Sequence, residues 1–100
     1  MTKYNIRFHK LAEKEYIEAY LWYEEKLKGL GAKFESSVEK KVNLIANNPE
    51  QYQIKFNQYR ECKIGVFPFV LVFKIYEQLR IVLILAVFHT SKNPINKYRK

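Results

Sequence analysis

The chain carries few of the side chains from which catalytic sites are usually built. Its 100 residues include one cysteine, Cys62, two histidines, His9 and His89, three glycines and three serines, and no aspartate. This inventory excludes an internal disulfide, a four-ligand zinc site, a glycine-rich nucleotide loop, an EF-hand and a Ser-His-Asp triad. His89 has suitable chemistry for a general base, but no second histidine or acid is placed to orient it, so we interpret it as the polar end of a strand. We expect neither a metal nor a cofactor.

Basic side chains, in contrast, are abundant and unevenly distributed. The chain has 18 Lys and Arg against 10 acidic residues, all of them glutamate, and a formal net charge of +8. Residues 10–50 hold seven basic and eight acidic groups, so the other segments carry the whole excess. Four cations lie in the last twelve residues, where there is no acid: Lys92, Lys97, Arg99 and Lys100.

This positive charge indicates an anionic partner, because Lys and Arg attract phosphates and carboxylates. It does not distinguish nucleic acid from an acidic protein. Lys55, Arg60 and Lys63 would form one basic surface with the tail if the fold brings them together. The alternative is a set of scattered, solvated lysines with a solubilising tail.

These residues need elements to position them, and the hydrophobic pattern predicts those elements. Apolar and polar residues alternate over about 3–8, which predicts a strand. From Lys10 the apolar spacing changes to three and four, which predicts an amphipathic helix that ends at Gly29 and Gly31. A second helix follows and ends before Pro49, since proline cannot continue the helical ladder. The short connection between the helices makes them antiparallel neighbours.

The pattern after Pro49 predicts four more strands. They are expected at residues 52–56, 62–66, 69–76 and 79–88. Asn57-Gln58 is an expected turn, and Glu77-Gln78 is an expected tight hairpin. The order β-α-α-β-β-β-β predicts a single two-layer α+β domain over residues 1–100. In chain order it consists of an N-terminal strand, a helical hairpin and then an antiparallel sheet. Residues 89–100 form a basic tail.

The last two predicted strands are apolar on both faces. We therefore expect the sheet face away from the helices to be partly covered, or to expose an apolar patch. Cys62 alternates with Ile64, which indicates a small core residue. The longest apolar run, Ile81 to Phe88, is shorter than the roughly 20 residues of a membrane helix. Because the first residues show no apolar signal segment, we expect a cytoplasmic protein with no membrane contact.

Other positions have a structural and a functional interpretation. Trp22 lies on a helix flank outside the main apolar stripe, so it packs under the sheet edge or anchors a partner. Arg60 either binds an acidic side chain of a partner or braces the sheet. We interpret His9 as the start of the first helix. Phe67, Pro68 and Phe69 are interpreted as structural, with the aromatic rings in the core.

Several sequence features together resemble the ParE, or plasmid stabilisation, branch of the RelE/ParE toxin superfamily. In chain order they are Ala12-Glu13, Leu21 to Glu24, Gly29 to Gly31 with Phe34, Asn48-Pro49, Tyr52, Arg60, Phe67 to Phe73, Ala86 to His89, and Lys92 with Pro94. Their order and spacing cover essentially the whole chain. The resemblance implies a small basic toxin of a type II toxin–antitoxin pair, neutralised by direct binding of an antitoxin encoded beside it.

The superfamily contains two mechanisms. RelE-like members are ribosome-dependent endoribonucleases, which need cations around the scissile phosphate and a group that activates the 2′-hydroxyl. Arg60 matches one of their basic positions, but the approximate counterparts of the others are Cys62, Val70 and Thr90, which are not cations. A rearranged, metal-independent nuclease site would use Arg60, Lys63, His89, Lys92 and Tyr98.

The missing cations favour the ParE-like mechanism, in which the toxin binds DNA gyrase and blocks it. The protein would then be a binding inhibitor, with gyrase and a cognate antitoxin as partners. We expect the antitoxin to bind at Trp22, Tyr23 and Arg60. The expected target-binding residues are Lys92, Lys97, Tyr98, Arg99 and Lys100. The alternatives are a nuclease acting on the ribosome and an inactive relative that binds nucleic acid.

Deletion of residues 92–100 should abolish toxicity and leave antitoxin binding mostly intact, because the basic tail is interpreted as target-facing. Growth arrest on induction measures the first property, and co-purification with the antitoxin measures the second. Loss of both properties, or of neither, would contradict this division.

Overall fold

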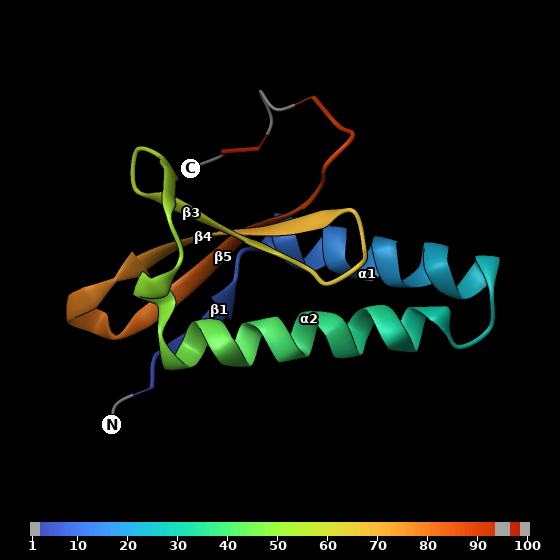
Figure 1. The fold of residues 1–100 in the computed structure, drawn as a ribbon, viewed down its shortest axis with the longest axis horizontal. Helices are drawn as coiled ribbons and strands as arrows, with labels where there is room; N and C mark the ends of the chain where they lie inside the picture. Colours follow the sequence, from blue (N-terminus) through green and yellow to red (C-terminus); the bar gives the residue numbers. More distant parts are fainter. Residues whose placement is uncertain (1–2, 94–96, 99–100) are drawn as a thin grey trace.

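A computed structural model, which describes residues 3–93 and 97–98, has an α+β fold in two layers (Figure 1). Its elements are β1 Asn5–Phe8, α1 Lys10–Lys26, α2 Leu30–Asn47, β2 Ile54–Phe56, β3 Tyr59–Lys63, β4 Phe69–Tyr76 and β5 Ile81–His89. Two short 3-10 helices are η1 Pro49–Gln51 and η2 Glu77–Leu79. The predicted order of strands and helices is confirmed. Within the described residues, no helix combines the length and apolar character needed to cross a membrane.

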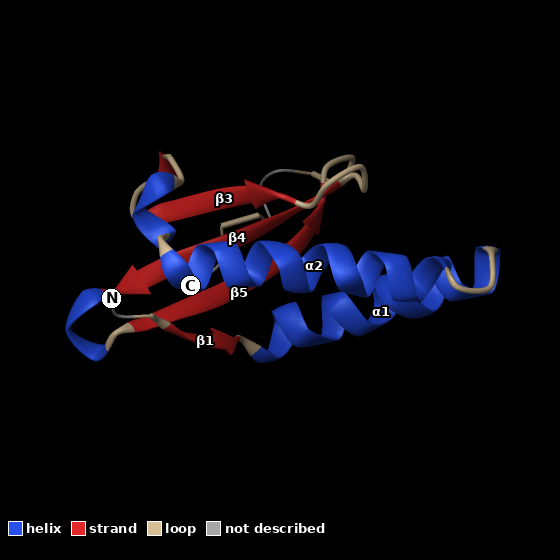
Figure 2. Ribbon diagram, turned by 60° about the horizontal axis from the view of Figure 1, so that its bottom comes forward, coloured by secondary structure: helices blue, strands red, loops and turns tan. Residues whose placement is uncertain are grey.

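The five strands form one mixed sheet in the order β1-β5-β4-β3-β2. Strands β2 to β5 are antiparallel, as expected, whereas β1 pairs in parallel with β5, with Asn5 opposite Ile81 and Phe8 opposite Ile84. Strands β1 and β2, which flank the helices in the sequence, therefore lie at opposite edges of the sheet. The helical hairpin must span the sheet between them, so both helices cover the same face (Figure 2).

The helical hairpin is fixed by side-chain contacts at its ends. The Nδ1 atom of His9 accepts the backbone N–H of Leu11 at 3.1 Å, which confirms His9 as the start of α1. The carboxylate of Glu24 accepts the N–H groups of Gly29 and Gly31, each at 2.9 Å, and so caps α2 from the preceding helix. A Cβ at Gly31 would lie 2.8 Å from Glu24 Oε1 and 2.8 Å from a backbone oxygen of α1, so the close approach requires glycine.

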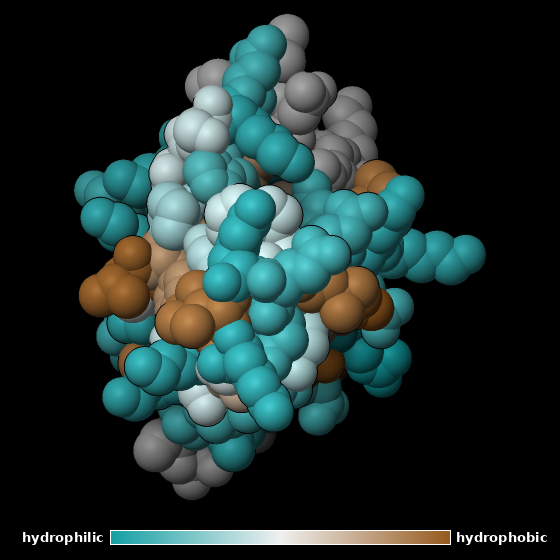
Figure 3. Space-filling view, turned by 90° about the vertical axis from the view of Figure 1, so that its right-hand side faces the viewer, coloured by the Kyte–Doolittle hydropathy of each residue, from teal (hydrophilic) through white to brown (hydrophobic). Residues whose placement is uncertain are grey.

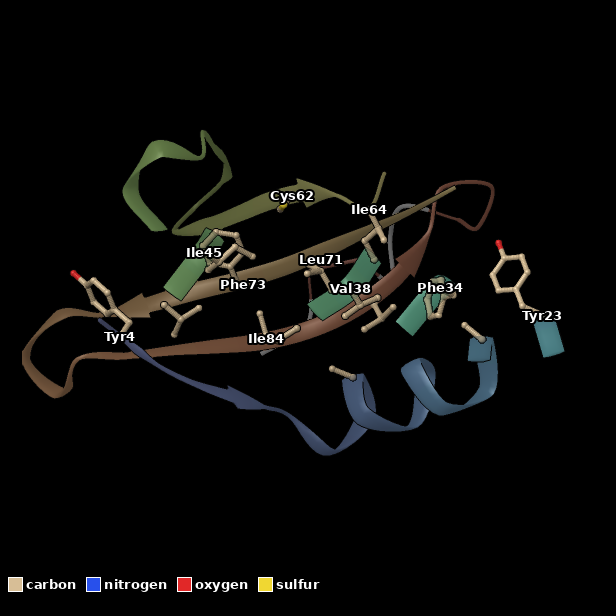
Figure 4. Packing of buried hydrophobic residues seen from close by; sticks show 14 residues of the cluster. Tyr4, Tyr23, Phe34, Val38, Ile45, Cys62, Ile64, Leu71, Phe73 and Ile84 are labelled. Atoms are coloured by element: carbon tan, nitrogen blue, oxygen red, sulfur yellow. The ribbon is translucent and has the colours of Figure 1, made fainter. Parts of the chain in front are cut away.

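The main core lies between the helices and the sheet (Figure 4). Phe34 of α2 is fully buried, and its ring lies 5.2 to 5.9 Å from four other aromatic rings: those of Tyr16, Tyr23, Phe67 and Phe69. The structural interpretation of Phe67 and Phe69 is thereby confirmed. Cys62 is buried in the same cluster, at 3% exposure, as its alternation predicted.

A β-bulge in β5 places two adjacent residues, Leu85 and Ala86, on the same face of the sheet. Val72 is opposite Ala86 and Phe73 is opposite Ile84, so Leu85 is an extra residue in the ladder. Without the extra residue, every side chain of β5 on one side of the bulge would point to the opposite face of the sheet. The prediction of strands that are apolar on both faces is confirmed, since a second buried cluster lies on the side away from the helices.

Several predicted boundaries were wrong: for example, α1 ends at Lys26, before Gly29, and Gly31 lies inside α2. Tyr52 lies after η1 and outside β2, because the helix-ending proline starts a 3-10 turn. Val66 is 94% exposed in a turn, because the chain leaves the sheet before Gly65, which has φ of 49°. The expected two-residue hairpin is instead η2, which Arg80 ends in the left-handed region at φ of 53°.

We expect Phe34→Ala to lower the free energy of unfolding by about 3–5 kcal/mol, because it removes a ring that is packed on all sides. Urea denaturation followed by circular dichroism measures this change. The exposed neighbour provides a matched control, and Lys33→Ala should change the same quantity by less than about 0.5 kcal/mol. Equal effects of the two substitutions would contradict the packing described for Phe34.

Candidate functional site

The sheet face turned away from the helices is here called the open face. Its buried residues are Tyr59, Val70, Val72, Leu85, Ala86 and Phe88. Both helices lie on the other side of the sheet (Figure 1). Two described residues of the predicted tail contact this second cluster instead: Tyr98 packs against it, and Lys97 lies over the Phe88 ring.

The tail is held on the open face by Glu61 of β3. Lys97 Nζ lies 3.1 Å from Glu61 Oε2, and the hydroxyl of Tyr98 donates to the same oxygen. The Tyr98 ring lies 5.0 Å from that of Phe56 and 5.3 Å from that of Tyr59. The side chains of Lys97 and Glu61 are only 20% and 11% exposed. Lys97 and Tyr98, both of the expected target-binding set, thus contact the sheet. Arg99 and Lys100 of the same set lie outside the described residues.

The environment of Tyr98 keeps its phenol protonated. Burial, followed by the hydrogen bond to Glu61 and the charge of that carboxylate, raises the pKa of Tyr98 from 10 to about 12. A proton on the phenol is what allows it to donate to the carboxylate. At neutral pH the Tyr98 hydroxyl is therefore a hydrogen-bond donor that fixes the tail.

The residues named for a nuclease site occupy different surfaces. Side chains alternate along β3, so Arg60 and Lys63, which are three residues apart, point to opposite faces. Lys63 shares the open face with Tyr98, whereas Arg60 points to the helix side. His89 and Lys92 border a separate groove beside α1. The fold does not bring the five side chains together around one point.

Arg60 borders a hollow between β2 and the end of β4. Its Nη1 atom donates to the carbonyl oxygens of Tyr52 at 2.6 Å and Glu50 at 3.4 Å, and so holds η1 against β3. The hollow has a volume of about 510 Å³, and its apolar lining includes Ile54 and Leu79. The backbone contacts fit the bracing interpretation of Arg60, and its contact with an antitoxin stays a prediction.

A polar cluster beside this hollow was not predicted. The Tyr4 hydroxyl donates to Glu77 at 2.9 Å, and Arg80 donates to the Tyr4 oxygen at 3.1 Å while its guanidinium lies over the Tyr4 ring. Hydrogen bonds with Glu50 and Tyr4 lower the pKa of Glu77, and the contact with Glu77 raises that of Glu50. The cluster joins Tyr4, just before β1, to the β4–β5 turn, across 73 residues of sequence, so no local pattern indicates it.

A groove of about 250 Å³ lies between α1 and the neighbouring ends of β4 and β5; we call it the α1 groove. It is lined by Glu15, Glu18, Ala19, Trp22, Tyr23, Phe69, Val87, His89 and Lys92. Strand β5 continues beyond its pairing with β1, and Glu15 accepts the backbone N–H of Val87 there at 2.9 Å. The α1 flank thus closes the exposed edge of β5.

Two predicted residues of the α1 groove are placed as their patterns indicated. Trp22 is 55% exposed on the helix flank, whereas Tyr23 beside it is buried in the core. His89 ends β5, where its Nδ1 accepts the backbone N–H of Ser91 at 3.1 Å and its ring lies 4.9 Å from that of Phe69. These contacts fit the interpretation of His89 as the polar end of a strand.

The expected antitoxin residues lie at two separated places. The α1 groove includes Phe69 at the beginning of β4, and the Arg60 hollow includes Tyr76 at its end. Arg60 lies opposite Phe73 of β4, so it is separated from Trp22 and Tyr23 by the part of the strand between Phe69 and Phe73. Seen from the end where the helices join, apolar side chains form distinct areas within a largely hydrophilic surface (Figure 3). Within residues 3–93 and 97–98, no three His, Cys or Glu side chains are grouped as metal ligands.

Comparisons with known proteins identify relatives of this fold. The family model described as "ParE toxin of type II toxin-antitoxin system, parDE" matches residues 6–94. A structure of the chromosomal ParDE toxin–antitoxin system from P. aeruginosa has a TM-score of 0.76 and 13% identity, over 89% of this chain and 98% of that chain. The likeness establishes a shared fold.

Two RelBE structures have the same fold. The intact RelBE toxin–antitoxin complex of E. coli gives a TM-score of 0.69 at 17% identity, over 89% of this chain and 99% of that chain. RelBE2 from Mycobacterium tuberculosis gives 0.66 at 16% identity, over 92% and 97%. No curated protein sequence matches the chain significantly.

We expect Tyr98→Phe to weaken the fold in a pH-dependent way, because it removes the hydroxyl and keeps the ring. The folded-state pKa of Tyr98 is raised, so its hydroxyl contributes stability below about pH 10 and loses that contribution as the pH rises through about 12. Urea denaturation of both proteins between about pH 8 and pH 12 measures the difference in unfolding free energy. A difference that does not shrink with rising pH would contradict the donor role.

Proposed function

We propose that this chain, which belongs to the ParE toxin family of type II toxin–antitoxin systems, harms its host cell by binding DNA gyrase and blocking it. The observation that carries this proposal is the separation of the candidate nuclease side chains. Arg60 lies on the helix side, Lys63 and Tyr98 on the open face, and His89 beside α1. A blocking protein needs a surface, whereas a nuclease needs these groups around one phosphate.

The state of two residues further supports binding over RNA cleavage. Activation of a 2′-hydroxyl needs a group that accepts a proton at neutral pH, and a phenol with a pKa of about 12 retains its own. The Nη1 donor of Arg60 is already bonded to two backbone carbonyls. In this arrangement Tyr98 does not supply the proton acceptor that the nuclease alternative needs, and Arg60 is held against the backbone of residues 50 and 52.

A cognate antitoxin neutralises the toxin in this proposal. The α1 groove, with Trp22 at its rim, offers an apolar anchor site, and Arg60 offers a cation opposite Phe73, farther along β4. A partner that contacts both must be elongated, which suits a disordered segment that folds on binding. The RelBE neighbours are themselves toxin–antitoxin complexes, which supports a protein partner of this kind.

The target-facing part in this proposal is the end of the chain. Lys92 is exposed where the tail begins, whereas Lys97 and Tyr98 are docked through Glu61. Lys92 is thus a described tail cation that is available to a target. The toxin acts in the cytoplasm, where gyrase lies.

We expect purified toxin in excess to inhibit DNA supercoiling by gyrase, and Lys92→Glu to weaken this inhibition about tenfold, because charge reversal replaces attraction by repulsion. An agarose-gel supercoiling assay over a toxin titration measures the effect. Lys40→Glu, on the exposed side of α2, makes the same change in net charge and should inhibit like the unmodified toxin. Unchanged supercoiling activity of gyrase in the presence of excess toxin would contradict the proposal.

Two further measurements separate the alternative functions. Primer extension on translated mRNA after induction would reveal codon-positioned cuts if the chain is a ribosome-dependent nuclease. Growth arrest that the neighbouring gene reverses would exclude an inactive relative that only binds nucleic acid. The proposal predicts growth arrest without such cuts.

A further inference from the structure

The aromatic side chains that line the α1 groove form one continuous series. Between ring centroids, Trp22 lies 5.1 Å from Tyr23, and Phe69 lies 4.9 Å from His89, in each case edge to face. Tyr23 and Phe69, 6.2 Å apart, connect the two pairs. The face of an aromatic ring carries partial negative charge, so it attracts a cation that lies over it. The groove thus offers ring surface of a kind that suits a positively charged group.

The Trp22 ring already attracts an ammonium group of its own chain. The Nζ atom of Lys26, one helical turn farther along α1, lies 4.9 Å from the centroid of the Trp22 ring. More than half of the Trp22 surface is exposed, so this contact leaves part of the residue accessible. The surroundings of Trp22 are therefore favourable for a cation, on a protein that is otherwise strongly basic.

Two carboxylates of α1 complete the groove. Glu15 and Glu18 line it, and Lys92 is the single Lys or Arg among its described lining residues. Glu18 and Trp22 also border a second hollow of about 540 Å³, whose other lining residues are Leu21, Glu24 and Glu25. Four of the chain's ten acidic residues therefore lie around Trp22, although the net charge of the chain is +8. Complementarity of charge selects a basic ligand for this flank of α1.

We propose that the α1 groove binds an arginine side chain of the antitoxin, an inference that rests on the proposed function. That function places the antitoxin at the groove, and the lining of the groove specifies the chemistry of the side chain that enters it. A guanidinium group is planar and weakly hydrated, so its face stacks on aromatic rings while its N–H groups donate to carboxylates. A lysine ammonium is compact and strongly hydrated, so it makes less use of the two kinds of lining residue.

A second copy of this chain is a less suitable partner. Arg60 and Arg80 are bonded within the chain, to the Tyr52 carbonyl and the Tyr4 hydroxyl. Arg7, on the exposed side of β1, would have to reach the groove of another molecule. Two copies that each carry a net charge of +8 repel each other, and a different protein does not carry this penalty by necessity.

Trp22 is the only tryptophan of the chain, so its indole N–H signal in an NMR spectrum reports on the groove. The first probe is N-acetylarginine amide. Its control is N-acetylcitrulline amide, which has nearly the same shape and no charge. At constant ionic strength, the arginine probe should shift the Trp22 signal saturably and bind about tenfold more tightly than the citrulline probe.

Substitutions of two lining residues should change the affinity for the arginine probe in opposite directions. Glu18→Gln removes an attractive charge and should weaken binding about threefold, whereas Lys92→Gln removes a repulsive charge and should strengthen binding about threefold. Glu39→Gln, on the exposed side of α2, makes the same change in charge as Glu18→Gln and should leave the affinity unchanged. Thermal melting of each variant checks that it is folded.

The protein encoded beside this chain's gene tests whether the antitoxin supplies the arginine. Glu18→Gln should weaken its binding to the toxin about threefold, and Glu39→Gln should leave that binding unchanged. In the complex, the arginine probe should no longer shift the Trp22 signal, because the groove is then occupied.

The other outcomes are distinguishable. A Trp22 signal that does not shift saturably, or that responds equally to both probes, overturns the cation site and leaves the proposed function standing. A probe that binds as expected while Glu18→Gln leaves the antitoxin affinity unchanged overturns the assignment of the arginine to the antitoxin. A Trp22 signal that shifts with toxin concentration alone indicates a second copy at the groove and contradicts the same assignment. Failure of the neighbouring protein to bind the unmodified toxin contradicts the proposed antitoxin itself.

Discussion

Burial of β4 and β5 on both faces is the constraint on which the rest of this structure depends. Val72 and Phe73, adjacent in β4, are both fully buried although they point to opposite sides of the sheet. Each side therefore needs a cover that excludes water. The helical hairpin supplies one cover, and the chain after β5 supplies the other. The tail is consequently part of the fold as well as a candidate for binding a target.

The elements with strong local signals were predictable from the sequence. The bounds of β4, at Phe69–Tyr76, are those that its apolar run predicted, and α2 ends at Asn47, shortly before the proline that cannot continue it. The parallel pairing of β1 with β5 was not predictable, because it joins segments at opposite ends of the chain. The bulge at Leu85 was not predictable either. Because β5 is apolar on both faces, its sequence shows no alternation that an extra residue would interrupt.

The candidate site was predictable by residue type and not by arrangement. The count of cations left open whether Arg60, Lys63 and the tail share one surface, and the alternation of β3 sends Arg60 to the opposite face from Lys63. The contact of Tyr98 with Glu61 spans 37 residues and depends on the tail folding back, which no local pattern encodes. Among these cations, Lys97 is therefore paired with Glu61 on the open face, and Arg60 is bonded to backbone carbonyls at η1 and Tyr52.

The stacking of Phe56 against Tyr98 has a consequence for regulation. The first ring belongs to the exposed edge strand and the second to the tail, and their centroids are 5.0 Å apart. A ligand of the edge that displaces this contact changes the position of the tail, and a ligand that draws the tail away changes the edge. Thermodynamic linkage makes the two effects equal in free energy. The β2 edge and the tail are thereby coupled through one pair of rings.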